Sequence, residues 1–335
     1  MKMRQIMPED GDEDPTLQVE VRQNSKLVVD EDALASLAAQ LTEEEAQRCD
    51  ASMMRRYIRA CGGDQKQALR RIRDTLAWFE AERPDHLHCR ACARDPKSHY
   101  MQVVAWDRGR RPTIYSCLSI PTCRTMEDTR AHMIATFQQA IACMAGGVED
   151  WVWVLDMHGF GLRDIDPRIA FAFLKVSAAH YPERLAQAYI VSAPRIFSTF
   201  WHSISPFIDA KTKAKIHFGH YNKHGGNEKL RAALCKNMDD ETVHWMMEEM
   251  AENRIKAVAH RKHYYHPDLV ALARDPQGAG VVAAEARRRA ASAGRHHDCL
   301  GTPAFLASMA GHPECIPPSL FVLADTSVGP HPHRH

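Results

Sequence analysis

No stretch of the sequence approaches the roughly 18 consecutive apolar residues that mark a membrane-spanning helix. The start of the chain also lacks the apolar core of a secretory signal peptide. Charge of one sign is not in excess, because 43 Lys and Arg residues face 42 Asp and Glu residues. The net charge of +1 gives no reason to expect nucleic acid as a partner. We therefore expect a cytoplasmic protein whose association with membranes is local and transient.

Familiar catalytic motifs are missing as well. The chain has no G-x-S-x-G nucleophile elbow, no glycine-rich phosphate-binding loop and no H-E-x-x-H motif. A nucleophile, a base and a group that orients the base do not occur at a spacing typical of a catalytic site. We therefore predict no catalytic residues and no cofactor, and we expect a protein that is not an enzyme.

The ten cysteines are scattered along a chain that is large enough to fold without disulfides, so we expect reduced thiols. One short segment contains four residues of the zinc-ligand type, His86, His88, Cys89 and Cys92. Structural zinc sites ordinarily take a second pair of ligands from another segment, and no such pair follows at the usual interval. We therefore predict no metal site and keep these four residues as a candidate set.

With 45% hydrophobic residues, the 335-residue chain can bury a large core. Composition and hydrophobic periodicity divide it into five regions. We expect a disordered acidic tail (1–30), a helical lobe (31–83), an α/β domain (95–225), a helical C-terminal region (226–295) and a last segment of doubtful order (296–335). A protein partner could bind through the helical C-terminal region.

Local signals support helices in the lobe and alternating strands and helices after it. Thr42 and Asp64 each start a capping box, and Gly62 with Gly63 ends the helix between them. The arginines of that helix are interpreted as a solvated face. Farther on, an apolar run at 151–155 predicts a strand covered on both faces. The order strand, helix, strand, helix, strand predicts a mostly parallel sheet flanked by helices.

The segment 181–218 contains a run of aromatic and aliphatic residues at spacings of three and four, which places them on one face of a helix. These residues are Phe197, Phe200, Trp201, Ile204, Phe207 and Ile208. Such a stripe is typical of an ordinary core helix, and it is also what a ligand-covering helix would present. Spacing alone does not separate the two interpretations.

The same segment also contains four short motifs. They read YPERL at 181–185, APRIF at 193–197, PFID at 206–209 and TKAKI at 212–216. In this order they resemble the closing half of a CRAL-TRIO lipid-binding domain, the fold of phosphatidylinositol transfer proteins. The hairpin turn at 107–112 and the helical pair at 54–78 resemble earlier parts of the same family. The resemblance implies a CRAL-TRIO fold preceded by a helical lobe, with a strand at 212–216.

The resemblance also implies a lipid site. In members that bind phosphatidylinositol, a Glu of the first motif and a Lys of the last bind the inositol phosphate; the matching residues are Glu183 and Lys215. The aromatic helix becomes a gate over the lipid cavity. Members that exchange phosphatidylcholine carry two hydroxyl residues where this chain has Trp151 and Trp153. Indole rings can hold a quaternary ammonium, and they can also narrow the cavity.

We therefore expect a protein that binds a phospholipid, foremost phosphatidylinositol, and transfers it between membranes or presents it to a lipid-modifying enzyme. Two alternatives stay open. The cavity could carry another hydrophobic molecule, such as a sterol, tocopherol or retinoid. Alternatively, the domain could be an adaptor that transfers nothing and binds a protein through the region after residue 225.

Overall fold

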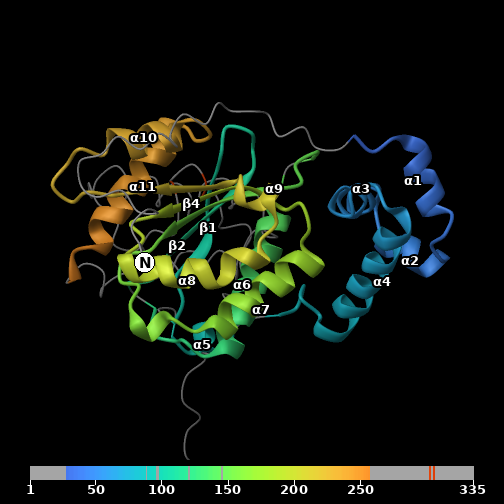
Figure 1. Ribbon diagram of the computed structural model, residues 1–335, viewed down its shortest axis with the longest axis horizontal. Helices are drawn as coiled ribbons and strands as arrows, with labels where there is room; N and C mark the ends of the chain where they lie inside the picture. Colours follow the sequence, from blue (N-terminus) through green and yellow to red (C-terminus); the bar gives the residue numbers. More distant parts are fainter. Residues whose placement is uncertain are drawn as a thin grey trace, which may run out of the picture.

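Five strands form a single sheet in the order β1-β2-β3-β4-β5 (Figure 1). The computed structural model describes residues 28–87, 89–95, 98–119, 121–144, 146–256, 302 and 305. The strands are β1 (Met101–Trp106), β2 (Pro112–Cys117), β3 (Trp151–Asp156), β4 (Leu185–Val191) and β5 (Ile216–Gly219). β1 and β2 are antiparallel, and the three following pairs are parallel. The predicted mostly parallel sheet is confirmed.

Helices surround this sheet and also form a lobe beside it (Figure 1). The lobe contains α1 (Glu31–Ala38), α2 (Glu43–Arg48), α3 (Ala51–Ala60) and α4 (Gln65–Glu82). In the described part of the chain, the other α-helices are α5 (Arg90–Arg94), α6 (Met126–Ala142), α7 (Pro167–His180), α8 (Arg195–Ile204), α9 (Ala210–Lys213), α10 (Glu228–Cys235) and α11 (Asp240–Asn253). Two short 3-10 helices are η2 (Leu162–Asp164) and η3 (Ser205–Phe207).

The local signals for helix ends are largely confirmed. Thr42 and Glu45 form the capping box of α2, and the Asp64 carboxylate accepts the amide N–H of Gln67 at the start of α4. Gly62 has a φ of 63°, the left-handed geometry that ends a helix. The strand expected at 212–216 is wrong, because Asp209 caps α9 and β5 begins only at Ile216. The predicted acidic tail, except for residues 28–30, lies outside the described residues.

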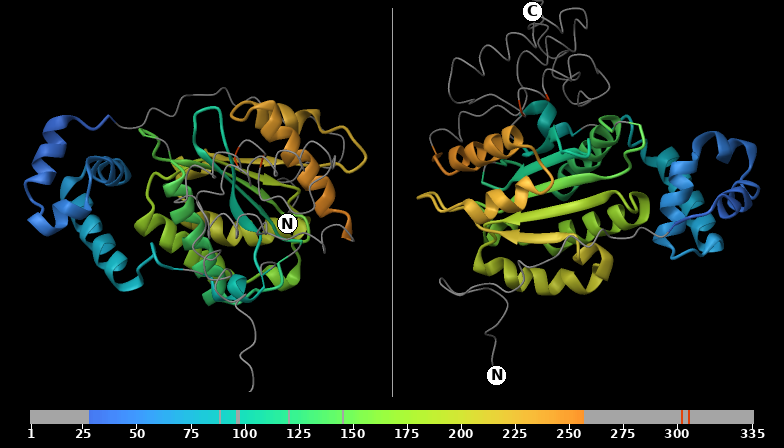
Figure 2. Two further views of the ribbon diagram at one scale, coloured as in Figure 1. Left: turned by 180° about the vertical axis from the view of Figure 1, so that it is seen from behind. Right: turned by 90° about the horizontal axis from the view of Figure 1, so that it is seen from above.

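The two faces of the sheet carry different helices (Figure 2). Side chains alternate along a strand, so Trp151 and Trp153 of β3 share one face, where they contact Phe137 of α6 and Phe173 of α7. On the other face Tyr115 of β2 contacts Trp245 of α11. Both α10 and α11 contribute fully buried side chains to the main core, namely Leu234, Met246 and Met250. The described part of 226–295 therefore covers the second face of the sheet.

A buried ion pair joins α11 to the carboxyl end of the central strand. The Asp156 carboxylate has no exposed surface, and it accepts hydrogen bonds from Arg254 at 2.8 and 3.0 Å. The hydroxyl of Tyr115 donates to the same carboxylate at 3.2 Å. Arg254 also donates to the Ser192 hydroxyl after β4 and lies 4.5 Å from the ring centre of Tyr221. One carboxylate thus links β2, β3, β4 and α11.

We predict that Arg254→Met lowers the free energy of unfolding by about 3 kcal/mol, because it leaves the buried Asp156 carboxylate without its countercharge. Urea unfolding followed by circular dichroism measures this loss. Adding Asp156→Asn to that variant should recover part of it. Removing an exposed partner, as in Arg168→Ala, should change little; equal losses in Arg254→Met and Arg168→Ala would contradict the prediction.

The helical lobe docks onto the end of α7 through its main-chain carbonyls. The Tyr57 hydroxyl donates to Ala179 O at 3.2 Å, and the Thr75 hydroxyl donates to the same oxygen at 3.3 Å. The Arg71 guanidinium donates to Ala178 O. The last four carbonyls of a helix lack partners within it. The lobe therefore supplies the hydrogen bonds that α7 cannot make for itself.

A second contact between lobe and sheet domain is ionic. The carboxylate oxygens of Glu149, just before β3, lie 2.9 Å from a guanidinium nitrogen of Arg59 and 3.8 Å from one of Arg56. The carboxylate also accepts a hydrogen bond from the Ser52 hydroxyl. Burial raises the pKa of Glu149, but the Ser52 hydrogen bond and the two arginine charges outweigh it, so the pKa lies below its ordinary value. The prediction that the arginines of α3 form a solvated face is therefore wrong for Arg56, which is buried at this interface.

His180 lies at the same interface, with its ring stacked on Trp78 at 4.1 Å and Nδ1 3.0 Å from the Thr75 hydroxyl. Burial, followed by the charges of Arg130 and Arg71, lowers the pKa of His180 from 6.5 to about 4. Between these pH values the unfolded chain binds the proton and the folded protein does not. The contribution of neutral His180 is therefore complete above pH 6.5 and is lost as the pH falls toward 4.

We predict that wild-type stability falls more steeply from pH 6.5 to 4 than that of His180→Phe, which keeps the ring and cannot bind a proton. Unfolding midpoints measured at several pH values give the two slopes. His224→Phe is the matched control, because His224 is exposed in the folded protein. The prediction is wrong if His180→Phe and His224→Phe show the same slope.

Candidate functional site

The predicted gate segment forms α8 and the short helix η3 rather than one continuous helix. Phe197, Ile204 and Ile208 are buried, Phe200 and Trp201 are half-buried, and Phe207 is 67% exposed. Phe197 packs with Met157 and Ile190 in a small hydrophobic cluster that is separate from the main core. The inner side of α8 therefore rests on its own set of contacts over β3 and β4.

Trp151 and Trp153 lie on the same face of the sheet, farther toward the amino ends of the strands. Trp151 is 3% exposed and stacks on Phe137 with ring centres 4.6 Å apart. Trp153 packs on Phe173 at 5.1 Å, and its indole N–H donates to the Ser116 hydroxyl at 2.8 Å. The rings thus fill space between sheet and helices. Of the two interpretations, narrowing of the cavity fits this packing better than an open aromatic cage.

Glu183 and Lys215, which are 32 positions apart in the sequence, come together at the amino ends of β4 and β5. The Lys215 ammonium lies 4.0 Å from a Glu183 carboxylate oxygen, and the two side chains are 13% and 17% exposed. Lys215 also donates to the carbonyl of Leu185 at 2.7 Å. Glu183 has a φ of 58°, so the turn before β4 holds its backbone in left-handed geometry. A cation and a carboxylate are thus held side by side.

The Glu183–Lys215 pair, which we call the edge pair, lies next to the contact with the helical lobe. Arg184 follows Glu183, and its guanidinium donates to the carbonyl of Glu149 at 2.8 Å. Burial, followed by the charge of Arg56, lowers the pKa of Arg184 to about 10. The backbone that presents the edge pair is therefore anchored to the residue that the lobe arginines bind.

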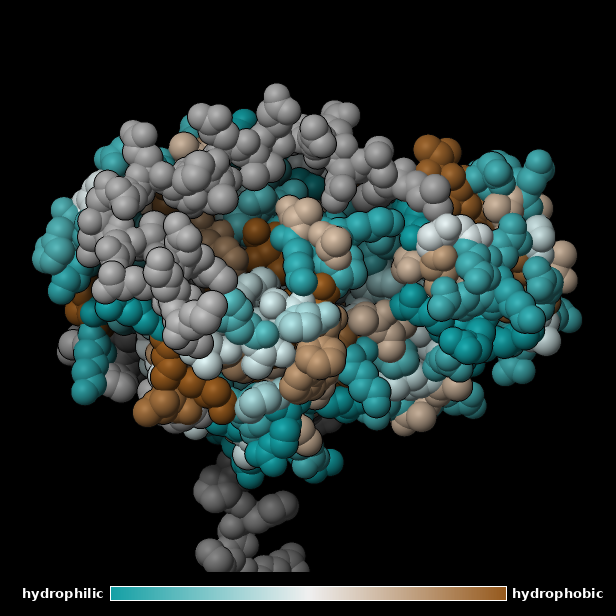
Figure 3. All heavy atoms as spheres, in the orientation of Figure 1, coloured by the Kyte–Doolittle hydropathy of each residue, from teal (hydrophilic) through white to brown (hydrophobic). Residues whose placement is uncertain are grey.

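Hydrophobic side chains are exposed near the gate. Figure 3 shows the face of the molecule that carries α8, where hydrophobic patches lie among hydrophilic residues. The exposed ring of Phe207 contacts Phe171 of α7 edge-to-face at 4.9 Å. Other exposed apolar residues are Leu162 of η2 and Phe218 of β5. None of the described helices combines the length and the apolar character needed to cross a bilayer.

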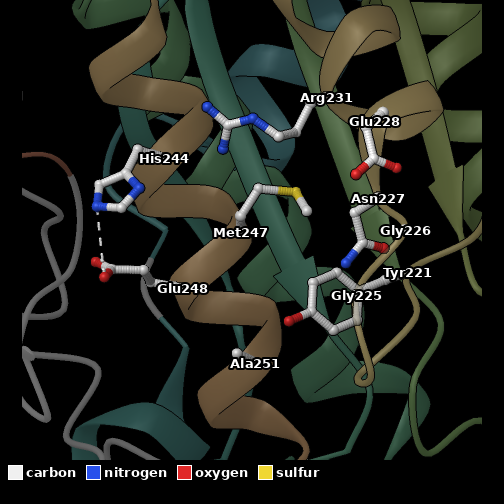
Figure 4. A pocket seen from close by; sticks show the side chains of 10 residues that line it. All are labelled: Tyr221, Gly225, Gly226, Asn227, Glu228, Arg231, His244, Met247, Glu248 and Ala251. Atoms are coloured by element: carbon white, nitrogen blue, oxygen red, sulfur yellow. Dashed lines mark ion pairs between the residues drawn. The ribbon is translucent and has the colours of Figure 1, made fainter.

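A pocket of about 370 Å³ lies between the loop after β5, α10 and α11 (Figure 4). Tyr221, Arg231 and Met247 contribute to its lining, and an ion pair between His244 and Glu248 of α11 lies on one side. Since α10 and α11 cover the face opposite to α8, this pocket is separate from the predicted lipid site. No sequence motif indicates this pocket, because its lining comes from three segments.

The candidate metal ligands are only partly brought together. Cys89 and Cys92 are buried and lie beside each other, whereas His86 is exposed and pairs with Asp85. His88 lies outside the described residues. Two other histidines, His99 and His132, lie with the cysteines in a group whose ligand-type atoms are all within 4.8 Å of one another. The sequence prediction missed both, because they come from separate elements.

Comparison with known proteins gives one family match. The model of the CRAL/TRIO domain matches residues 97–239. The chain is 26% identical over 165 residues to a CRAL-TRIO domain-containing protein of Schizosaccharomyces pombe, covering 49% of this chain and 16% of that protein. It is 25% identical over 176 residues to phosphatidylinositol transfer protein PDR17 of Saccharomyces cerevisiae, covering 49% and 50%.

A third relative is the phosphatidylinositol/phosphatidylcholine transfer protein SFH7 of Arabidopsis thaliana, 25% identical over 198 residues, with 50% of this chain and 35% of that protein covered. The chain thus matches half or less of the length of each of these relatives. Among solved structures, the crystal structure of Sfh5 superposes with a TM-score of 0.43 at 14% identity, covering 55% of this chain and 68% of that one.

We predict that the aromatic residues of this face differ in how much they contribute to the free energy of unfolding. Trp151→Ala should lower the free energy of unfolding by about 3–5 kcal/mol, because it leaves a cavity beside Phe137 in the main core. Trp201→Ala on α8 should cost less, because Trp201 is half-buried and belongs to the small cluster. Chemical unfolding of both variants tests the difference, and a larger loss in Trp201→Ala would refute it.

Proposed function

We propose that the protein, whose residues 97–239 match the model of the CRAL/TRIO domain, binds a phospholipid, foremost phosphatidylinositol, and carries it between membranes or presents it to lipid-modifying enzymes. Two relatives that are named as phosphatidylinositol transfer proteins support this class of ligand. The observation that carries the proposal is the edge pair, Glu183 and Lys215, held 4.0 Å apart at one edge of the sheet. The role is binding and release rather than catalysis.

The edge pair has the chemistry that an inositol phosphate needs. The Lys215 ammonium can donate charge-assisted hydrogen bonds to a phosphate, and the Glu183 carboxylate can accept from inositol hydroxyls. Both side chains are mostly shielded from solvent, so the pairing of opposite charges is weakened less by water than at an open surface. When the headgroup binds, it replaces the contact that the two side chains make with each other.

The acyl chains would lie between the sheet and α8. Each methylene that leaves water contributes about 0.8 kcal/mol, so two chains supply enough free energy to offset extraction from a membrane. The small cluster beneath α8 is separate from the main core, so α8 can move outward without disturbing the residues that hold the sheet. The exposed rings of Phe171 and Phe207 would meet the membrane surface while the gate is open.

We predict that Lys215→Ala lowers phosphatidylinositol transfer between vesicles by at least about tenfold, since a hydrogen bond to a charged group contributes about 1.5–3 kcal/mol. The measurement follows a labelled lipid from donor to acceptor vesicles, and circular dichroism checks the fold. Lys211→Ala in α9 is the matched control, because it removes the same charge from an exposed position nearby.

Unchanged transfer by Lys215→Ala would rule out the headgroup assignment, and an equal loss in Lys211→Ala would point to general membrane attraction instead. Glu183→Gln keeps the shape of the side chain and removes its charge. In that variant the transfer of phosphatidylinositol should fall more than that of a lipid whose headgroup has no ring hydroxyls.

A second candidate function is the transport of another hydrophobic molecule, such as a sterol, tocopherol or retinoid. The packing of Trp151 and Trp153 against Phe137 and Phe173 favours it, because these rings occupy space that a second acyl chain would use. Mass spectrometry of lipids that copurify with the full-length protein separates the two functions. A ligand without a phosphate would leave Lys215 without a role in binding.

A further inference from the structure

Four buried side chains from three segments of the chain converge beside the sheet. Cys89 precedes α5, Cys92 lies in α5, His99 precedes β1 and His132 lies in α6. Their ligand-type atoms, two sulfurs and two ring nitrogens, all lie within 4.8 Å of one another. In Figure 1, α5 lies beside α6, with which it is in contact. The group contains no carboxylate and is shielded from solvent.

The spacing of these atoms fits the edges of a tetrahedron around one metal ion. The Cys89 sulfur lies 3.4 Å from His99 Nδ1, and the Cys92 sulfur lies 3.4 Å from the Nδ1 atoms of both His99 and His132. With Zn–S near 2.3 Å and Zn–N near 2.0–2.1 Å, a tetrahedral site has a sulfur-to-nitrogen edge of about 3.5 Å. The three distances therefore need little change to hold zinc.

The second ring nitrogen of each histidine, Nε2, also lies within hydrogen-bond distance of a partner. His132 Nε2 lies 2.7 Å from the carbonyl oxygen of Met101, which can only accept, so Nε2 carries the hydrogen. The lone pair of that imidazole is then on Nδ1 and points toward Cys92. His99 Nε2 lies 3.3 Å from the hydroxyl of Thr129. Metal-binding histidines characteristically direct their other ring nitrogen to such partners.

We propose that Cys89, Cys92, His99 and His132 bind one structural Zn²⁺ ion. Two sulfur and two imidazole ligands in a tetrahedral arrangement select zinc over magnesium or calcium, which take oxygen ligands. Four protein ligands leave no open position for a substrate, so the ion is not catalytic. The spacing is C-x2-C-x6-H-x32-H, in which the second ligand pair is split between the segment before β1 and the helix α6.

A zinc ion at this site would stabilise the segment that connects the lobe to the sheet domain. The segment between α4 and β1 contains α5, which has only five residues and is too short to be stable alone. Coordination joins this segment to the start of β1 through His99 and to α6 through His132. Because a structural metal binds the folded state and not the unfolded chain, its binding free energy adds to stability.

The direct test is the zinc content of purified full-length protein, measured by mass spectrometry of the metal. We expect about one zinc ion per chain, and at least about a tenfold loss in the double variant Cys89→Ser/Cys92→Ser. Cys143→Ser is the matched control, because Cys143 is a buried cysteine outside the group. Adding a strong chelator to wild type should lower its unfolding temperature and leave that of the double variant unchanged.

Three results would overturn the proposal: wild-type protein without zinc after growth in zinc-supplemented medium, zinc retained in the double variant, or a disulfide between Cys89 and Cys92 in place of the metal. His99→Cys and His99→Ala provide a comparison that does not depend on the cysteines. A third thiolate should keep the zinc in His99→Cys, whereas His99→Ala should lose it.

Because a cysteine variant can fail to fold, the ligand set is also tested in the wild type. X-ray absorption at the zinc edge should show two sulfur neighbours near 2.3 Å and two nitrogen neighbours near 2.0–2.1 Å. Substitution with Co²⁺ should give the visible absorption of a tetrahedral thiolate complex. A shell made only of oxygen and nitrogen would exclude this site.

Discussion

The Asp156 carboxylate is the charge on which the arrangement of the sheet domain depends. It is fully buried at the carboxyl end of β3, where an unpaired charge would cost several kcal/mol. Arg254 neutralises it, and Tyr115 and the backbone N–H of His158 complete its hydrogen bonds. The pair fixes α11 over one face of the sheet, while α8 on the opposite face is held by a smaller set of apolar contacts. The two faces are therefore secured to different degrees.

Much of the fold follows from local sequence signals, because capping and strand burial depend on neighbouring residues. The capping box at Thr42 and the buried strand after residue 150 are examples. The predicted strand at 212–216 is wrong, because Asp209 caps a turn of helix that shortens the strand from its amino end. The buried position of Arg56 was equally unpredictable, since its partner Glu149 lies 93 positions away in the sequence.

The candidate sites divide in the same way. The roles of Glu183 and Lys215 are predicted from the resemblance of their motifs to a family, since nothing in their spacing alone indicates that the two side chains lie close together. The sequence shows Cys89 and Cys92 as a pair, but not His99 and His132 with them, because the segment before β1 and the helix α6 bring the two histidines in separately. The usual zinc spacing places the second pair of ligands together in one other segment. Here the two histidines come from two different segments.

The docking of the lobe onto α7 limits which mutations the chain can accept during evolution. Its hydrogen bonds end on the carbonyls of Ala178 and Ala179, and every amino acid carries such a carbonyl. Substitutions at these two positions therefore leave the acceptors in place as long as the helix ends at the same point. The constraint falls on the donors Tyr57, Arg71 and Thr75 and on the length of α7. An insertion or deletion in α7 would shift these two acceptors away from their donors, whereas a point mutation at 178 or 179 would leave them in place.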